Sequence, residues 1–380
     1  MKDKARFRAG IFLALGALLI IVPLAGVAIG SVPIPLPGLL RILASPLAKV
    51  AERVLETWSS IVLGLHLPRV VAIPVFDLLN KFVLPFAKVA EGIPETWQTI
   101  VLRLRLPRVL AAMLVGAALA LSGSTMQGLF KNPLADPFIM GVSSGASVGA
   151  AAAMLMGLAW TDAGAFAIPL TAFAGGLGSL IMVYSLAGSG GRRSTLSLLL
   201  AGTAVSTFLG AVVALLTFFS GQQLQQVVFW MMGGFSGRNW IHVLSMLPWL
   251  GLGSAVIFWH ARDLDALAMG EEQAHYMGVE VEKVKARLLW ASALLAAAAV
   301  SVSGLIGFIG LVVPHAMRLV GGPAHRWLLP AAALAGAVFM VAADLLARVV
   351  LAPVELPVGL VTALIGAPFF LYLLKKRRLK

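Results

Sequence analysis

The chain has 380 residues, of which 60% are hydrophobic and 12% are charged, and its mean hydropathy is +0.95. This composition excludes an ordinary soluble domain and is typical of a polytopic membrane protein. The net charge of +13 does not indicate a nucleic-acid-binding face, because the basic residues fall mostly between apolar runs. The absence of cysteine excludes disulfides, cysteine-based metal sites and thiol chemistry.

Ten apolar runs are candidates for crossing a bilayer whose hydrocarbon core is about 30 Å thick. We expect the spans near residues 9–30, 108–129, 138–158, 164–187, 195–219, 240–260, 286–304, 304–319, 326–351 and 356–374. The first run is interpreted as a retained helix, because it lacks the small-x-small cleavage site of a signal peptide. The sequence therefore predicts an all-α polytopic membrane protein with about ten transmembrane helices, forming a single transmembrane domain over residues 1–380.

The basic residues orient these spans. Ten crossings place both termini on the same side of the membrane. If that side is the cytoplasm, the inner segments hold 18 of the 29 basic residues, including the tail "KKRRLK" (375–380). The short outer loops then hold only Arg238 and Arg348. By the positive-inside rule, both termini are predicted to be cytoplasmic.

A long segment, residues 31–107, lies between the first two spans and is predicted to be extracytoplasmic. It contains a 39-residue tandem duplication, in which residues 47–71 align without gaps on residues 86–110 with 16 of 25 positions identical. Only the second copy leads directly into a span, and we expect the first copy to lie as an amphipathic helix on the outer surface. The second copy places Arg105 and Arg108 at this outer edge, where the usual charge bias disfavours them.

Two polar segments are predicted on the cytoplasmic side. The segment "NPLADP" (132–137) is held in shape by two prolines and has turn-forming Asn and Asp residues. The segment "MGEEQAHYMG" (269–278) places acidic residues between Gly270 and Gly278, which suits a short helix that enters a groove of another protein. A simple tight turn and a solvated loop of mixed charge explain the two segments equally well.

Asp344 is the one acidic residue expected within a span, and it lies four residues before Arg348. This spacing puts both side chains on one helix face, which leaves open a structural ion pair or a functional intramembrane acid. His315 is interpreted as a packing residue, because six scattered histidines do not indicate a metal site.

Taken together, six stretches resemble the FecCD-like permease subunits of type II ATP-binding-cassette importers for iron-siderophores, haem and vitamin B12. They cover residues 100–374 in the family's order, and only the duplicated segment at 40–90 departs from its pattern. The stretches are "LRLPRVLAA", "GAALALSGSTMQGLFKNPLADPFIMGVSSGA", "STLSLLLAG", "MGEEQAHYMGV", "SGLIGFIGLVVPHAMRL" and "LPVGLVTALIGAPFF".

The resemblance implies a multi-pass permease of a prokaryotic cytoplasmic (inner) membrane. It would form a homodimer, work with two cytoplasmic ATPase subunits and receive its substrate from an extracytoplasmic binding protein. No catalytic residue, metal or cofactor is expected on this chain, because ATP and Mg²⁺ would be bound by the ATPase. Matched residue by residue, the motifs assign binding-protein docking to Arg105, Arg108 and Arg348; ATPase coupling to Gly270, Glu271, Glu272, Ala274 and Gly278; and a cytoplasmic gate to Asn132, Leu134, Thr195 and Leu196.

The pathway is expected along residues 198–219 and 220–240, where Trp230, Met231 and Met232 could adapt to a bulky ligand. The cargo stays open among a ferric siderophore, haem, cobalamin and an oxyanion, with an iron chelate favoured. An alternative is an ion-coupled secondary transporter that uses Asp344, although such a protein is expected to have several intramembrane acids. An intramembrane enzyme is disfavoured, because it would need two or more catalytic polar groups that meet inside the bilayer, and the sequence has neither a P-loop nor an "HExxH" motif.

Overall fold

The computed structural model describes residues 2–30, 32–46, 92–158, 164–188 and 194–378, and all regular structure in these ranges is helical. The predicted amphipathic helix of the first repeat copy lies outside the described residues. The helices discussed below are α1 (Lys2–Ala28), α4 (Glu95–Thr99), α5 (Leu106–Leu129), α6 (Val142–Leu155), α7 (Gly164–Leu186), α8 (Thr195–Phe218), α9 (Leu224–Met232), α10 (Trp240–Trp259), α11 (Ala261–Met269), α12 (Glu271–Tyr276), α13 (Val281–Ser303), α14 (Ile309–Gly321), α15 (His325–Val349) and α16 (Val358–Arg378).

Seven of the described helical segments are long and apolar enough to cross a membrane, and three shorter apolar helices accompany them. The shorter ones are Val142–Leu155, Ile309–Gly321 and Val358–Tyr372. Together these ten segments coincide with the ten predicted runs. The prediction of an all-α polytopic membrane protein with about ten spans is therefore confirmed.

The second span begins earlier than predicted. The helical segment starts at Glu95 and not at residue 108, and it continues through a π-helical turn, Ile100–Arg105, into α5. Pro107 has no backbone N–H for the carbonyl four residues before it, and a wider turn just before such a proline relieves the mismatch. Because Pro107 bends the helix without ending it, the basic stretch before it is helical as well.

The residue contacts divide the chain into two compact units. Unit 1 consists of Met1–Gly26 and Arg108–Lys380, and unit 2 is Val27–Pro107. Unit 2 corresponds closely to the segment 31–107 that the sequence predicts outside the membrane. The functional residues of the spans therefore belong to unit 1.

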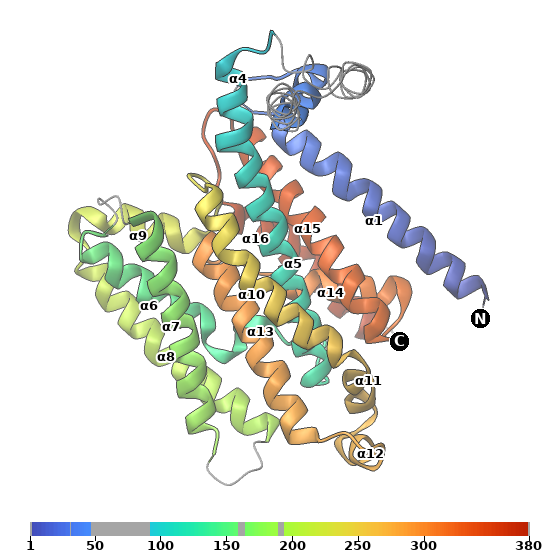
Figure 1. Cartoon of the computed structure of the whole chain (residues 1–380). Coiled ribbons are helices and arrows are strands. Elements are labelled where there is room, and N and C mark those ends of the chain that lie inside the picture. Colours follow the sequence, from blue (N-terminus) through green and yellow to red (C-terminus); the bar gives the residue numbers. More distant parts are fainter. Residues whose placement is uncertain (1, 31, 47–91, 159–163, 189–193, 379–380) are drawn as a thin grey trace, which may run out of the picture. The chain divides into compact units, whose positions relative to one another are not determined.

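Helix α13 forms the centre of unit 1. It packs against α6, α7 and α10, and nearly all of its residues from Leu288 to Ser303 are buried. Figure 1 shows α6, α7 and α8 packed beside one another, as their contacts also indicate. The alanine-rich run 296–299 lets these neighbours approach closely, because small side chains allow tight helix packing in lipid.

Glycines mark the closest helix crossings. Gly116 on α5 and Gly336 on α15 each lie against the other's backbone carbonyl, and Gly145 on α6 and Gly175 on α7 do the same. A Cβ atom at any of these four positions would overlap a backbone oxygen. These glycines therefore set the distance between helices.

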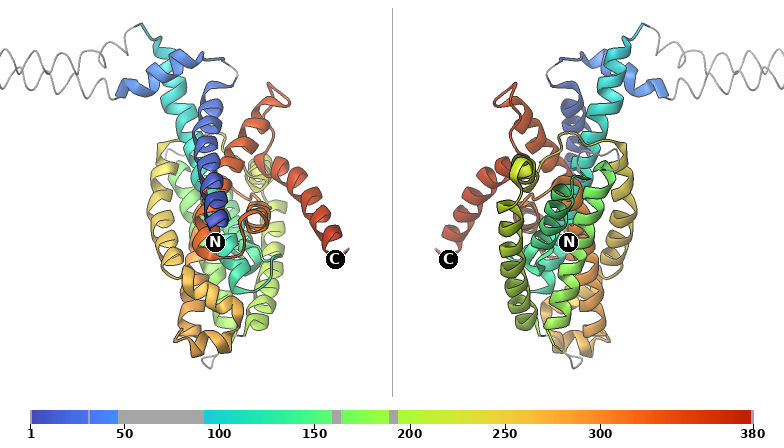
Figure 2. Two further views of the ribbon diagram at one scale, coloured as in Figure 1. Left: turned by 90° about the vertical axis from the view of Figure 1, so that its right-hand side faces the viewer. Right: turned by 90° about the vertical axis from the view of Figure 1, so that its left-hand side faces the viewer.

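Helices α8 and α16 are among those that present apolar side chains outward. Their exposed positions include Phe208 and Phe218 on α8 and Leu364 on α16. Figure 2 shows α16 diverging from the neighbouring helices of unit 1 toward its carboxyl end. In a membrane protein such faces contact lipid or another subunit.

Candidate functional site

An outer charge cluster joins α5 to α15. It consists of Arg108, Asp344, Arg348 and Glu355. An Arg108 nitrogen lies 2.8 Å from an Asp344 oxygen, and Arg348 Nε lies 3.1 Å from the other oxygen of the same carboxylate. Arg108 also donates to both oxygens of Glu355, at 2.9 and 3.0 Å. Asp344 is fully buried, whereas 42% of the Glu355 side chain is exposed.

The cluster is electrically balanced, with two guanidinium groups and two carboxylates. Burying the Asp344 charge is tolerated because two guanidinium groups offset the loss of hydration: Arg108 donates to Oδ1, and Arg348 forms an ion pair with Oδ2. Arg348 also donates to the carbonyl of Gly26, at 2.8 Å. The predicted same-face spacing of Asp344 and Arg348 is thus an ion pair in the structure. Sequence reasoning did not find the Arg108 contact, because 236 residues separate it from Asp344.

Arg105 occupies a different environment, within unit 2. Its guanidinium is buried and donates to the carbonyls of Val27 and Ala28 at 3.0 Å and of Val32 at 2.7 Å. A cation that binds the last carbonyls of a helix complements the helix dipole. Arg105 therefore holds the carboxyl end of α1 within unit 2. Arg103, two residues earlier, is exposed.

The cytoplasmic polar segment forms two short helices, α11 and α12. Gly270 and Gly278 flank α12 with φ angles of 143° and 85°, which favour glycine. Glu271 accepts from the buried Lys285 of α13 at 3.0 Å, while Glu272 is exposed. Ala274 is fully buried in this chain, so its small size serves internal packing.

The same region is firmly attached to the membrane helices. Asp265 of α11 accepts from the backbone N–H of His325 at 2.8 Å and lies 2.7 Å from its ring Nδ1. This contact caps the first turn of α15. Tyr276, at the end of α12, and Met277 after it are exposed, with 79% and 54% of their surfaces accessible. Large apolar side chains exposed outside the spans indicate a protein interface.

The predicted gate residues lie at two turns. The side chain of Asn132 accepts from the backbone N–H of Leu134 at 2.9 Å, which shapes the first turn. Ser194 caps α8 just before Thr195 and Leu196. Leu134 and Leu196 are both exposed. The preceding arginines, residues 192–193, lie outside the described residues.

The first turn also holds a partly buried acid, Asp136, that the sequence did not single out for titration. Asp136 accepts from the backbone N–H of Phe138 at 2.8 Å and caps the 3-10 turn Pro137–Met140. Burial raises the pKa of the Asp136 carboxyl to about 6, against the lowering effect of the Phe138 hydrogen bond. The carboxyl therefore titrates well above its usual range.

Replacing Asp136 with asparagine is expected to stabilise the protein by about 1–3 kcal/mol at pH 7.5. The folded chain holds this proton more tightly than the unfolded chain, whose carboxyl has a pKa of 3.8, so stability falls as pH rises from about 4 through 6. Asparagine keeps the acceptor oxygen but has no charge. Melting temperatures of both proteins, measured from pH 4 to 7.5, should converge at the acid end. A constant difference at all pH values would contradict this.

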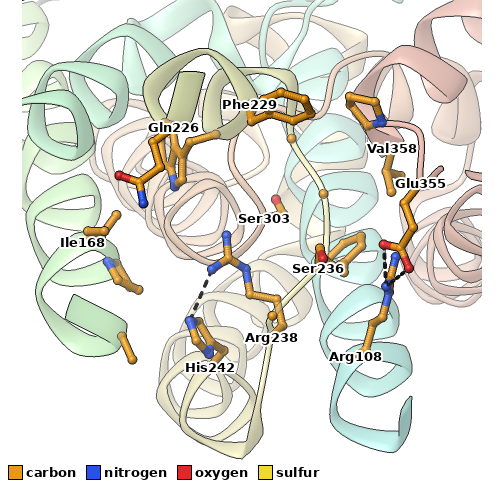
Figure 3. Close-up of a pocket in the computed structure, with 18 of the residues that line it drawn as sticks. Arg108, Ile168, Gln226, Phe229, Ser236, Arg238, His242, Ser303, Glu355 and Val358 are labelled. Atoms are coloured by element: carbon orange, nitrogen blue, oxygen red, sulfur yellow. Dashed lines mark hydrogen bonds and ion pairs between the residues drawn. The ribbon is translucent and has the colours of Figure 1, made fainter. Parts of the chain in front are cut away.

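A polar cavity of about 490 Å³ lies in unit 1, beneath the loop between α9 and α10 (Figure 3). Its wall includes Arg108 and Glu355 of the charge cluster, together with Gln226, Arg238 and His242. Trp230 of the predicted pathway segment also lines it, whereas Met231 and Met232 are absent from its lining. The sequence predicts Arg238 only as a loop cation; its isolation in "GGFSGRNW" was the available signal for a further role.

Arg238 has no ion-pair partner among the described residues. Its Nη1 atom lies 3.4 Å from Nε2 of His242, and its buried Nε atom has no hydrogen-bond partner. Burial lowers the pKa of the Arg238 guanidinium to about 10, which still leaves it charged at neutral pH. The cavity therefore contains a cation whose charge is not balanced by a direct contact.

The chain is similar to membrane permeases of one transport family. Residues 71–376 match the model of the FecCD transport family. The cobalamin import system permease of Halobacterium salinarum is 49% identical over 266 residues, which cover 70% of each chain. The hemin transport system permease of Yersinia pestis is 47% identical over 273 residues, which cover 70% of this chain and 80% of the relative.

A solved structure resembles this one. It is a metal-chelate type ABC transporter in an inward-facing conformation, with a TM-score of 0.75 and 30% sequence identity. The alignment covers 97% of this chain and 99% of the other.

Proposed function

This chain belongs to the FecCD transport family and is a multi-pass permease subunit of an ATP-binding-cassette importer, and from that premise we propose that it carries a metal chelate into the cytoplasm. The candidate cargoes are cobalamin, haem and a ferric siderophore, with the first two favoured. The observation that supports this choice is the 47–49% identity to permeases of cobalamin and hemin systems.

The assembly that we propose contains two copies of this chain and two ATPase subunits. The exposed apolar faces of α8 and α16 are suited to the contact between the two copies, with the pathway between them. The surface of α12 is suited to the ATPase, because it combines Glu272 with Tyr276 and Met277 on an element anchored to α13 and α15. ATP and Mg²⁺ belong to the ATPase, and we assign no cofactor to this chain.

At the gate, we propose that Asn132, Leu134, Thr195 and Leu196 close the cytoplasmic end of the pathway. The exposed leucines of the two turns would supply an apolar seal, and the Asn132 hydrogen bond would hold Leu134 in place.

Docking of an extracytoplasmic binding protein is proposed at the outer charge cluster. Arg108 already has Glu355 as a partner, and Glu355 is partly exposed. An incoming carboxylate could therefore exchange with Glu355, while Arg348 keeps its contact with Asp344. Arg105 is bonded to carbonyls within unit 2, so we propose that it acts there by holding the end of α1. Charges on a docking surface mainly steer encounter and fix orientation.

An ion-coupled mechanism through Asp344 is less well supported. Its carboxylate is fully buried between Arg108 and Arg348. A coupling ion would therefore have to displace one of these two arginines from the carboxylate.

The direct test is ATP-driven uptake into proteoliposomes that contain this permease, its ATPase and its binding protein. Cobalamin, haem and a ferric siderophore are supplied in parallel, and vesicles with a hydrolysis-deficient ATPase are the control. Selective accumulation of one chelate would support the proposal and name the cargo. Uptake driven by an ion gradient without ATP would contradict it, as would accumulation of none of the three by a stable complex.

A further inference from the structure

An apolar cleft of about 220 Å³ lies between α7 and α10, separate from the polar cavity. Phe166, Leu170 and Phe173 of α7 face Met246 and Trp249 of α10 across it. Phe173 stacks on Trp249 with ring centroids 4.8 Å apart, and α13 supplies Ala298 and Val302. The cleft therefore has an almost entirely apolar wall.

The rim of this cleft is accessible from the membrane side. Phe166 and Leu170 are about 60% exposed, and Trp249 is 36% exposed. Both helices of the rim are membrane spans, so the medium that meets these side chains is lipid hydrocarbon.

The apolar cleft and the polar cavity adjoin each other. Ala165 and Pro169 line both of them. Pro169 has no N–H, so the carbonyl of Ala165 lacks its intrahelical donor at this boundary. Along α10, His242 lines the polar cavity, and Ser245 and Trp249 line the cleft. At 1.5 Å per residue, the cleft extends roughly 10 Å inward from His242.

Arg238 gives the polar cavity, and the apolar cleft beside it, a preference for an anionic ligand. The Nε atom of Arg238 is buried at the outer end without a hydrogen-bond partner in the described chain, and the carboxylate that shares its cavity, Glu355, is bonded to Arg108. A partly buried cation without a counter-ion is only incompletely compensated. An anion from outside the chain would complete that compensation, and it would do so next to an apolar channel.

We propose that Arg238 and the apolar cleft form one binding site for an anionic glycerophospholipid of the outer leaflet. The lipid phosphate accepts hydrogen bonds from the Arg238 guanidinium, and one acyl chain lies between α7 and α10 against Phe173 and Trp249. A headgroup hydroxyl can donate to the Ala165 carbonyl. A lipid bound there fixes the spacing of α7 and α10 at their outer ends.

The test is native mass spectrometry of the delipidated full chain with phosphatidylglycerol. Arg238→Gln is expected to weaken binding about tenfold, the usual effect of losing one charge-assisted hydrogen bond. Arg262→Gln, at an exposed arginine of α11, is the matched control and should leave binding unchanged. Ser245→Phe, which fills the cleft, should also weaken binding, whereas Leu244→Phe at a 60% exposed neighbour outside the cleft should not.

A comparison of lipids with different headgroups separates the contribution of the headgroup to binding from that of the acyl chain. Phosphatidylcholine should bind at least tenfold more weakly than phosphatidylglycerol, and glycerol phosphate should not compete. Equal binding of both lipids would overturn the role of Arg238, and strong competition by glycerol phosphate would mean a site for soluble anions. A phosphatidylglycerol with a photoactivatable acyl chain provides a readout on the unmutated chain. Cross-links are expected within residues 165–173 and 241–249, and labelling confined to other segments would refute the site.

Discussion

Replacing Asp344 with asparagine is expected to destabilise the folded protein by about 3–5 kcal/mol, the largest effect of any single substitution considered for this chain. The change keeps the size of the side chain but leaves Arg108 and Arg348 facing each other without the buried carboxylate between them. Removing one partner of a buried ion pair costs more than the pair itself contributes, because the remaining charge is neither hydrated nor compensated. The measurement is the melting temperature of the detergent-solubilised chain, followed by intrinsic tryptophan fluorescence.

Glu355→Gln is the matched control for this experiment. It removes the other carboxylate that contacts Arg108, but that carboxylate is 42% exposed and partly hydrated. Its loss should therefore cost no more than about 1 kcal/mol. The double variant Asp344→Asn with Arg108→Gln should recover part of the lost stability, because it removes one of the two stranded cations. Equal melting temperatures for Asp344→Asn and the unmutated chain would show that the cluster does not stabilise the fold.

Reversing the charge of Glu272 is expected to reduce ATP-driven uptake at least tenfold without unfolding the permease. Glu272 is exposed on α12, beside the apolar side chains Tyr276 and Met277. Arginine at this position would repel the basic groups that we expect on the ATPase, and a like-charge contact in an interface costs several kcal/mol. Uptake in proteoliposomes and binding of the ATPase to immobilised permease are measured together.

The choice of Glu272 over Glu271 follows from the structure. Glu271 is bonded to Lys285, which is only 5% exposed, so an arginine there would also disturb packing inside the chain. Glu280→Arg is the matched control, because Glu280 is exposed and pairs with Lys283 outside α12. Unchanged ATPase binding in Glu272→Arg, with full uptake, would remove α12 from the proposed interface.

Much of the fold can be predicted from the sequence because a bilayer imposes a simple rule. Each span must be long and apolar, and its backbone must bond to itself, so ten runs in the sequence become ten helices. The beginning of the second span was the exception. Pro107 and the arginines before it look like a boundary, but the helix continues through a π-helical turn from Glu95. Local composition could not show that the basic stretch is helical.

The roles of charged residues were predictable only where the partner is near in sequence. The Asp344–Arg348 pair follows from a spacing of four residues, which places both on one face of α15. The Arg108 contact to the same carboxylate depends on how α5 packs against α15, and glycines at 116 and 336 set that distance. Arg105 resembles Arg108 in sequence, yet it is bound to backbone carbonyls of unit 2.

The sequence by itself determined the class of this protein, its ten spans and its family, because apolar length, charge bias and ordered motifs are properties of the linear chain. Only the tertiary structure decided which cations have a neighbouring carboxylate that balances their charge. Arg108 and Arg348 share a buried carboxylate, whereas Arg238 lies in a cavity without an ion pair in the described chain. The physical reason is that the cost of a buried charge depends on its neighbours in space, and residues far apart in sequence supply those neighbours.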